Sequence, residues 1–393
     1  MRKIAADLIL PVSLKPVRNG VVIVDDNGVI LKIDEQRNYD TSELEMHKGV
    51  IIPGFVNAHC HLELSHMKGK VDTGKGLIPF ITDVVTKRAA SDYEISEAIS
   101  KAEKEMIDNG IVAVGDISNV TDTFSQKAKG NLRYYTFVEF FDFLQDQNAI
   151  IEFDKYKAVF DELKLAKGSK KSVVPHAPYT VSKKLFQLLN EANGETPQTV
   201  SIHNQELIPE NDLFLTKTGT FIDFYGSFGI SLDEFEATGK TSIHYALENM
   251  NPNHKTLFVH NTKSTVEDIQ AAQAWGKDNV YWVTCPNANL YIENCLPDYR
   301  HFIDTNANIA IGTDSLTSNW QLCILDEMKT ISKFQSYIPF DMMLRWATLN
   351  GAEALGFDDT LGSIEVGKTP GLNLLSLGKD LKLSADTTVT KLI

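Results

Sequence analysis

Apolar and polar residues change their pattern near residue 60. Before this point, residues 20–34 contain two short apolar segments on either side of the turn sequence Asp26-Asn27-Gly28, which predicts a β-hairpin. After it, short apolar runs alternate with stretches of helical periodicity, such as residues 93–109 and 183–192. The pattern therefore predicts a small β unit at the start of the chain, followed by a larger α/β region.

Eight short apolar runs can be counted from this change onward, and most are separated by helical stretches. They are residues 51–58, 111–117, 132–140, 172–175, 200–202, 257–259, 280–283 and 309–312. Eight β-then-α units predict a (β/α)8 TIM-type barrel, whose active site lies at the C-terminal ends of the strands. The alternative, an open doubly wound sheet, usually carries a glycine-rich phosphate loop after its first strand, and the sequence has none there.

Short strand-like segments return around residues 362–368 and 372–377, after a helix that ends near Gly356. We expect residues 1–53 and 360–393 to pair into a small β-sandwich domain beside a barrel of residues 54–359. The longest connection between predicted strands runs from residue 204 to 256, and connections of that length are often lids or binding elements.

Length and composition are those of an ordinary globular enzyme: 393 residues, 43% hydrophobic and 23% charged. The net charge of −14 disfavours nucleic acid or an anionic membrane as the main partner. The four cysteines form no C-x-x-C pair, and no apolar run approaches the roughly 20 residues that span a bilayer. The N-terminal residues are a poor match to a signal peptide, so we expect a cytoplasmic protein with reduced thiols.

Histidines follow several of the predicted strands. His59 and His61 end the first strand at a spacing of i, i+2, which places both side chains on one face of the strand. Two imidazoles on one face can hold one divalent metal ion. Later strands are followed by further candidate ligands, namely His176, His203, His260 and Asp314. Because the C-terminal ends of barrel strands share one rim, these residues predict a metal-dependent hydrolase site there.

Four other residues are candidates for a role at this rim. Glu206 follows His203 by three residues and could act as a general acid or base, or could simply complement a helix dipole. Glu63 and Glu139 could each contact substrate or serve as a structural hydrogen-bonding partner. Trp282 could stack on a planar ring, although aromatic residues in a barrel strand more often belong to the core.

The motifs together resemble the amidohydrolase superfamily, and more narrowly its deaminase/chlorohydrolase branch. The segments that carry the resemblance are Pro-Gly-Phe-Val-Asn-Ala-His-x-His at 53–61, His176-Ala177-Pro178-Tyr179, His203-x-x-Glu206, His260, Gly312-Thr313-Asp314-Ser315, and the closing segments 347–356 and 362–368. Residues 61–65 and 214–221 look most like aminodeoxyfutalosine deaminase-like enzymes.

The resemblance implies one catalytic metal ion, with Zn²⁺ expected and Fe²⁺ as the alternative. Its implied ligands are His59, His61, His203 and Asp314. His260 would orient and help deprotonate the attacking water, Glu206 would protonate a ring nitrogen, and His176 would contact either the substrate or the metal ligands. Metal chemistry adds that Asp314 can accept the proton of the water while it is bound to the metal. Binuclear members carry a carboxylated lysine at the fourth strand, where this chain has Pro175-His176, which favours a single metal.

The substrate is less well defined than the metal site. Relatives often carry Arg or Thr where this chain has Asn287, and the segment Asn261-Thr262-Lys263 after His260 also departs from the family. Both departures are expected near the substrate.

The predicted function is hydrolytic deamination of an aminated heterocycle, such as adenosine, aminodeoxyfutalosine or another purine compound, by metal-activated water. Removal of chloride, removal of an amine substituent and hydrolysis of a ring amide remain alternatives on the same site, and an inactive scaffold is the non-enzyme alternative. The expected partner is a small heterocyclic substrate. A homodimer is compatible with the sequence, which specifies no interface.

Overall fold

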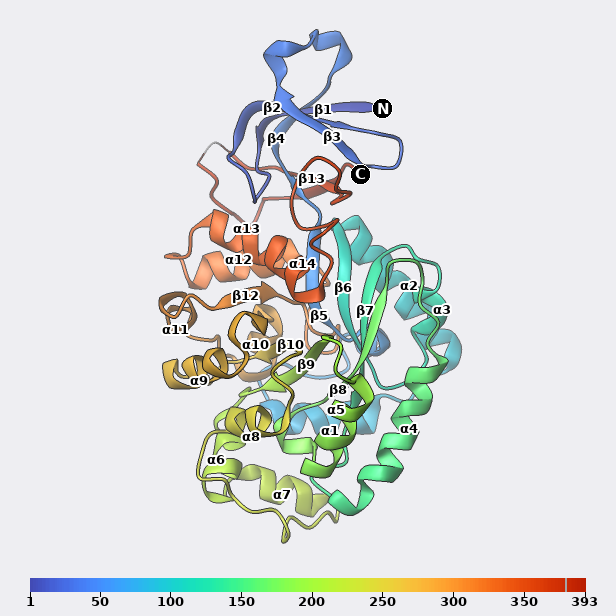
Figure 1. The fold of residues 1–393 in the computed structure, drawn as a ribbon, viewed down its shortest axis with the longest axis vertical. Coiled ribbons are helices and arrows are strands. Elements are labelled where there is room, and N and C mark those ends of the chain that lie inside the picture. Colours follow the sequence, from blue (N-terminus) through green and yellow to red (C-terminus); the bar gives the residue numbers. More distant parts are fainter. Residues whose placement is uncertain (379) are drawn as a thin grey trace.

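The computed structural model describes residues 1–378 and 380–393 (Figure 1). Strands from both termini form one six-stranded sheet at one end of the molecule, in the order β14-β13-β4-β1-β2-β3. The strands are β1 (Arg2–Ile9), β2 (Val17–Val24), β3 (Ile30–Glu35), β4 (Glu45–Pro53), β13 (Leu372–Leu375) and β14 (Val389–Lys391). β4 pairs in parallel with β1 and antiparallel with β13, so it joins the N-terminal strands to the C-terminal ones. The predicted pairing of the termini is therefore present in this sheet, and the sandwich arrangement stays a prediction.

The predicted hairpin is confirmed as β2 and β3, which pair antiparallel with Val22 opposite Ile33. Its turn is closed by a hydrogen bond from the Gly28 amide to the Asp25 carbonyl, 3.1 Å long. Gly28 has a φ of +80°, a conformation that glycine adopts without a steric penalty. The turn sequence identified from the chain thus forms for the expected conformational reason.

Two four-stranded parallel sheets follow, in the orders β5-β6-β7-β8 and β12-β11-β10-β9. Their strands are β5 (Phe55–Cys60), β6 (Ile111–Ser118), β7 (Arg133–Phe140), β8 (Lys170–Pro175), β9 (Thr199–Asn204), β10 (Lys255–His260), β11 (Val280–Thr284) and β12 (Asn308–Ile311). Each predicted strand from residue 111 onward matches one of these within a few residues. The predicted α/β fold with parallel strands is therefore confirmed.

The first predicted strand, residues 51–58, is in fact two strands that separate at Gly54. Residues 51–53 end β4 in the terminal sheet, and β5 begins at Phe55 in a parallel sheet. A Cβ atom on Gly54 would lie 2.4 Å from Val112 Cγ1 and 2.6 Å from the Pro370 carbonyl oxygen. The chain therefore crosses from the terminal sheet to the parallel sheet at Gly54, a position where a side chain would not fit.

Backbone hydrogen bonds connect the two parallel sheets at both pairs of outer strands. The His203 amide donates to the His176 carbonyl at 2.9 Å, which joins β9 to the end of β8. The Thr313 and Asp314 amides both donate to the His59 carbonyl at 3.0 Å, which joins the end of β12 to β5. The histidines and aspartate singled out in the sequence thus lie at the two junctions between the sheets.

Helices pack around the parallel strands (Figure 1). They are α1 (Leu77–Lys87), α2 (Asp92–Asp108), α3 (Phe124–Lys127), α4 (Ala149–Glu162), α5 (Lys183–Asn193), α6 (Ile208–Thr216), α7 (Thr220–Ser227), α8 (Ser242–Asn249), α9 (Val266–Gly276), α10 (Pro286–Glu293), α11 (Tyr299–Asp304), α12 (Ile324–Phe334), α13 (Phe340–Ala347) and α14 (Leu349–Leu355). The predicted helical stretches 93–109 and 183–192 correspond to α2 and α5. α2 begins with a capping box in which the Ser91 and Glu94 side chains each accept from the other's backbone amide.

The long connection between β9 and β10 contains α6, α7 and α8. It is therefore a folded element, and its Phe224 reaches the pocket described below. Across the described residues, no helix combines the length and the apolar character that a membrane crossing would need.

Candidate active site

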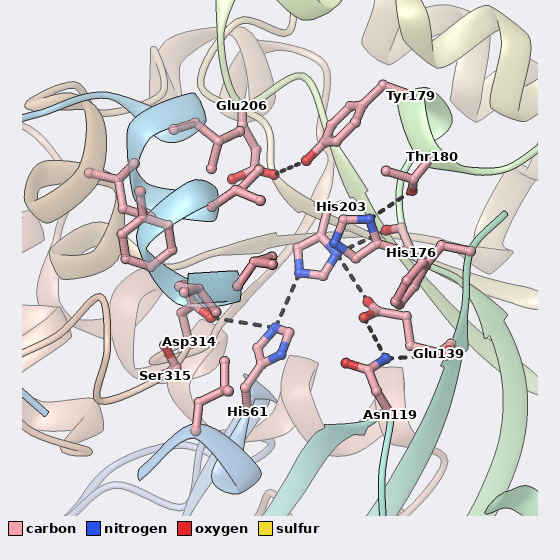
Figure 2. Close-up of a pocket in the computed structure, with 18 of the residues that line it drawn as sticks. His61, Asn119, Glu139, His176, Tyr179, Thr180, His203, Glu206, Asp314 and Ser315 are labelled. Atoms are coloured by element: carbon pink, nitrogen blue, oxygen red, sulfur yellow. Dashed lines mark hydrogen bonds and ion pairs between the residues drawn. The ribbon is translucent and has the colours of Figure 1, made fainter. Parts of the chain in front are cut away.

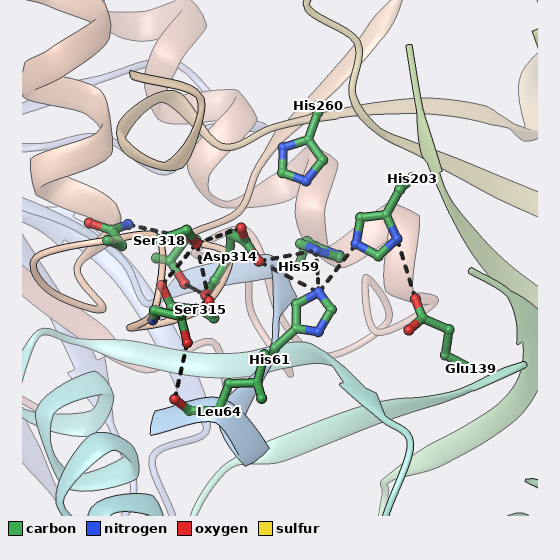
Figure 3. Close-up of polar contacts among 12 residues, drawn as sticks. His59, His61, Leu64, Glu139, His203, His260, Asp314, Ser315 and Ser318 are labelled. Atoms are coloured by element: carbon green, nitrogen blue, oxygen red, sulfur yellow. Dashed lines mark hydrogen bonds and ion pairs between the residues drawn. The ribbon is translucent and has the colours of Figure 1, made fainter. Parts of the chain in front are cut away.

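Three histidine side chains converge at the C-terminal ends of β5 and β9 (Figure 3). His61 Nε2 lies 3.1 Å from His59 Nε2 and 3.2 Å from His203 Nε2. Asp314 Oδ1 lies 3.5 Å from His61 Nε2 and 3.7 Å from His59 Nε2. The structure thus brings together all four residues that the sequence suggested as ligands.

This set of donor atoms fits one divalent cation. Ligands held about 2.0–2.1 Å from a tetrahedral Zn²⁺ are roughly 3.3 Å apart, close to the separations of the three Nε2 atoms. Burial lowers the pKa of His59 well below its ordinary value, and the neighbouring histidines lower it further. Burial also lowers the pKa of His61. Both imidazoles are therefore neutral, which is the form that binds a metal.

His203 is oriented by acceptors on the side of its ring away from the cluster. Its Nδ1 lies 2.9 Å from the His176 carbonyl oxygen and 3.3 Å from Glu139 Oε1, so this nitrogen carries the proton and Nε2 faces the other histidines. Burial opposes the charged form, but Glu139 raises the pKa of His203 to about 9. A more basic imidazole is a stronger metal ligand. Glu139 therefore serves as a hydrogen-bonding partner for His203.

Asp314 is held in place by the residues around it. The Ser318 hydroxyl donates to its Oδ2 at 2.6 Å, which leaves Oδ1 directed at the histidines. The preceding Gly312 allows β12 to approach β5 closely, because a Cβ there would lie 2.8 Å from His59 Cβ and 2.9 Å from the His59 backbone oxygen. Asp314 itself has a φ of +57°, a strained conformation that is often found at functional sites.

His61 is supported from behind by a buried ion pair. The Leu62 amide donates to Asp116 Oδ1 at 2.8 Å, and Asp116 Oδ2 lies 2.5 Å from Lys127 Nζ. The side chains of Asp116 and Lys127 are 0% and 4% exposed. A buried carboxylate without such a partner would be unfavourable, so Lys127 allows Asp116 to fix the turn that follows His61.

Glu206 and His260 form a second pair beside the histidine cluster. Glu206 Oε2 lies 3.6 Å from His260 Nε2, and the Tyr179 hydroxyl donates to Glu206 Oε1 at 3.4 Å (Figure 2). His260 Nδ1 lies 2.8 Å from Asn289 Oδ1, so this nitrogen donates and Nε2 faces the cavity. Two groups that can transfer protons therefore lie side by side next to the candidate metal ligands.

A pocket opens over these groups, and one of its walls is apolar. Its lining residues are His61, Leu64, Leu77, Phe80, Ile81, Val84, Val85, Arg88, Asn119, Glu139, Phe141, Phe143, His176, Tyr179, Thr180, His203, Glu206, Phe224, His260, Ile292, Asp314 and Ser315. The contribution of α1 to this wall was not among the predictions from the sequence. The apolar spacing of residues 77, 80, 81, 84 and 85 was the available signal, because it places them on one helical face.

Of the remaining candidates, His176 is the one that reaches the pocket. Its Nδ1 lies 2.7 Å from Thr180 Oγ1, and its ring centroid is 4.8 Å from that of His203. Burial lowers the pKa of His176 to about 4, so the ring is neutral. It can therefore contact a substrate as a hydrogen-bonding group without carrying a charge.

Glu63 and Trp282 are not among the described residues that line this pocket. Glu63 Oε2 accepts from the Asn119 amide at 2.9 Å and the Val120 amide at 3.3 Å, as expected of a structural partner. The Trp282 ring packs against Phe258 and Phe302, at centroid distances of 5.3 Å in both cases. The positions of both residues favour the structural alternatives, and their assignment as substrate contacts stays a prediction.

The two departures from the family motifs also have structural roles. The Asn287 amide and side chain donate to Glu327 at 2.8 and 3.0 Å, and Thr330 donates to the Asn287 side chain at 2.6 Å. Asn261 donates to the Phe258 carbonyl at 2.7 Å. Neither asparagine is among the lining residues of the described pocket. The expectation that the two departures lie near the substrate therefore stays a prediction.

Comparisons with known proteins agree with this site. A family model described as "Amidohydrolase family" matches residues 50–392. An adenosine deaminase of Helicobacter pylori is 26% identical over 372 residues, which cover 91% of this chain and 88% of the relative.

Two solved structures show a similar fold. The Helicobacter pylori aminofutalosine deaminase in complex with methylthio-coformycin has a TM-score of 0.80 at 24% identity, and the match covers 97% of this chain and 94% of that one. Atrazine chlorohydrolase from Arthrobacter aurescens complexed with zinc has a TM-score of 0.76 at 15% identity, over 98% of this chain and 90% of that one. At these identities the two matches establish likeness of fold.

The family model covers most of the chain, including the segments that hold the clustered histidines and Asp314. The resemblance found in the sequence motifs is therefore confirmed, together with the expected class of hydrolase: the chain belongs to the amidohydrolase family.

Proposed function

We propose that this protein is a metal-dependent deaminase that replaces an amino group on a purine-type heterocycle with oxygen. One observation carries the proposal, namely that Glu206 and His260, 3.6 Å apart, share a pocket with His61, His203 and Asp314. The adenosine deaminase and aminofutalosine deaminase among the similar proteins support the same reaction. The substrate is a small molecule, because the reactive groups lie inside a pocket.

His59, His61, His203 and Asp314 would hold the metal. Three imidazoles and one carboxylate suit Zn²⁺, with His203 giving up its extra proton as the metal binds, and the zinc complex of the atrazine chlorohydrolase supports that choice over Fe²⁺. When bound, such a metal is a Lewis acid that lowers the pKa of a water ligand to roughly 7.

The proton transfers are assigned to residues of this chain. His260, fixed by Asn289, orients the attacking water, and Asp314 accepts its proton. As oxygen adds to the ring carbon that bears the amino group, Glu206 donates a proton to the adjacent ring nitrogen. The bond from carbon to the amino nitrogen then breaks, and the proton on Asp314 leaves with ammonia. The added hydroxyl group becomes the carbonyl of the product as its proton passes to Glu206, which is thereby protonated again for the next turnover. Tyr179 holds Glu206 within reach of the ring nitrogen.

The pocket walls suit a flat ring that carries a further substituent. Neutral His176 can hydrogen-bond to the substrate, while Phe141, Phe143 and Phe224 offer apolar contacts. The side chains of α1 form the rest of the apolar wall. We therefore expect purine nucleosides to be better substrates than free purine bases.

We further propose that the two parallel sheets close into one (β/α)8 barrel, with the terminal sheet as a separate β-sandwich domain. The hydrogen bonds from His203 to His176, and from Thr313 and Asp314 to His59, support closure at both junctions. All four cysteines are free thiols, which supports action in the reducing cytoplasm.

The test is ammonia release by protein of known metal content, measured with adenosine, 5′-substituted adenosines, adenine, cytidine and 6-chloropurine riboside. We expect release from the adenosine compounds with about one metal per chain. Chloride release from 6-chloropurine riboside, without ammonia release from any of the amines, would show that the protein is a dechlorinase and not a deaminase. No turnover of any compound by the metal-loaded protein would overturn the proposal.

A further inference from the structure

Glu210 makes an unusual set of hydrogen bonds immediately after β9. It lies in the first turn of α6, with a side chain that is fully buried at 0% exposure. Its Oε1 accepts from the Gln205 amide at 2.9 Å and from the Ser242 hydroxyl at 2.7 Å. Its Oε2 accepts from the Glu206 amide, also at 2.9 Å. One carboxylate therefore binds two consecutive backbone amides, one of which belongs to the proposed general acid.

This arrangement differs from an ordinary helix cap. In a capping box, the carboxylate three residues into the helix accepts from the amide of the N-cap residue. The N-cap of α6 is Leu207, yet Glu210 binds the amides of the two residues before it. Glu210 therefore fixes the turn that leaves the strand, in addition to any effect on the helix.

The turn needs such a constraint because its backbone is strained. Gln205 has a φ of +47°, in the left-handed region that a non-glycine residue adopts only at a cost in conformational energy. Its carbonyl accepts from the Lys263 amide at 3.0 Å, and the Thr262 hydroxyl donates to the Glu206 carbonyl. Because residues 262 and 263 follow His260, the same turn also sets the position of Glu206 relative to His260.

We infer that Glu210 is a positioning residue for Glu206, with the two backbone amides as the link between them. The inference rests on the proposed role of Glu206 as the proton donor. A carboxylate suits the task because each of its oxygens accepts from one amide. A glutamine has only one acceptor oxygen. Its NH2 group would face the second backbone N–H, and two donors cannot form a hydrogen bond with each other.

The experiment is a double-mutant cycle on the metal-loaded protein. The variants are Glu206→Gln, Glu210→Gln and the double variant, each assayed for kcat, KM, metal content and thermal midpoint with adenosine or the best substrate found. Ser242→Ala is the matched control, because it removes one hydrogen bond from the same carboxylate and leaves both backbone amides bound. If Glu210→Gln does not fold, Glu210→Asp replaces it, since aspartate keeps two acceptor oxygens on a shorter side chain.

We expect Glu206→Gln to lose about 10²–10⁴-fold in kcat with metal retained, as is usual for a general acid. Glu210→Gln should lose about 10–100-fold in kcat with a nearly unchanged KM, because small misplacements of a reacting group have effects of this size. The double variant should be no slower than Glu206→Gln alone, because Glu210 acts through Glu206. Ser242→Ala should keep its kcat within about threefold, despite some loss of thermal stability.

Three results would overturn the inference: a wild-type kcat in Glu210→Gln, losses that multiply in the double variant, or a Ser242→Ala variant as slow as Glu210→Gln. Each of these would leave the proposed deamination intact. Wild-type turnover in Glu206→Gln, or no turnover in the wild-type protein, would instead contradict both the proposed function and this inference.

Discussion

Replacing Glu139 with glutamine should weaken metal binding without unfolding the protein. Glu139 Oε1 lies 3.3 Å from His203 Nδ1, and its carboxylate raises the pKa of His203 to about 9. At an effective dielectric constant of about 20, a unit charge at that distance interacts with a full positive charge on the ring by about 5 kcal/mol. A metal-bound imidazole carries only part of such a charge. Loss of a carboxylate partner of this kind typically weakens metal affinity 10–100-fold.

We therefore expect the zinc dissociation constant of Glu139→Gln to rise about 10–100-fold, or about 1.4–2.7 kcal/mol. The substituted side chain still offers an oxygen, and the His176 carbonyl still accepts from His203 Nδ1, so the ring should keep its orientation. The assay is competition for Zn²⁺ against a chelator of known affinity. Glu103→Gln is the matched control, because Glu103 is equally buried but accepts from Tyr134, Gln126 and Asn131, and its loss should affect stability alone. A folded Glu139→Gln protein with wild-type zinc affinity would refute this reasoning.

Four further changes test other parts of the structure. His203→Ala should lose metal and deaminase activity together, as measured by elemental analysis and ammonia release, and full activity without metal would contradict the site. Lys127→Met should lower the free energy of unfolding in urea by about 3–5 kcal/mol, because it leaves Asp116 buried without its partner, and adding Asp116→Asn should recover much of this loss. Phe224→Ala should raise KM and leave the metal content unchanged. An unaltered KM would show that the connection between β9 and β10 does not contact the substrate through this residue. Burial raises the pKa of Glu327 to about 8, so the folded protein holds this proton more tightly than the unfolded chain does. The free energy of unfolding should therefore fall as pH rises from about 4.5 to 8, and Glu327→Gln should flatten that part of the profile; the same pH dependence in the variant as in the wild type would contradict this assignment.

The strand pattern was readable from the sequence because the parallel strands are short, apolar and separated by helices. The i, i+2 spacing of His59 and His61 placed both rings at one point because His59 lies near the end of β5 and His61 directly follows its last residue, Cys60. The same alternation does not extend to Glu63. The chain leaves the strand after Cys60 and enters a short 3₁₀ helix, Leu62–Met67, where alternate residues no longer share a face.

Other features depended on information that a local pattern does not contain. Trp282 lies on a strand that is buried along its whole length, so apolar residues occur on both faces and the sequence does not show which face meets the pocket. The apolar spacing in α1 predicts one buried face but not the cavity that it lines. Glu210 and Asp116 act through hydrogen bonds from backbone amides. Every residue except proline has such an amide, so a sequence does not show which of them a side chain will bind.

The pairing of β4 has a consequence for how the protein is made. On one edge β4 pairs with β1, which is synthesised before it, but on the other it pairs with β13, which is translated only after the whole parallel-strand region. A nascent chain on the ribosome therefore carries β4 with one edge unpaired while all eight parallel strands are synthesised. Unpaired strand edges are templates for aggregation. Truncation after residue 371 should thus make a protein that aggregates, even though every residue of the metal site is present.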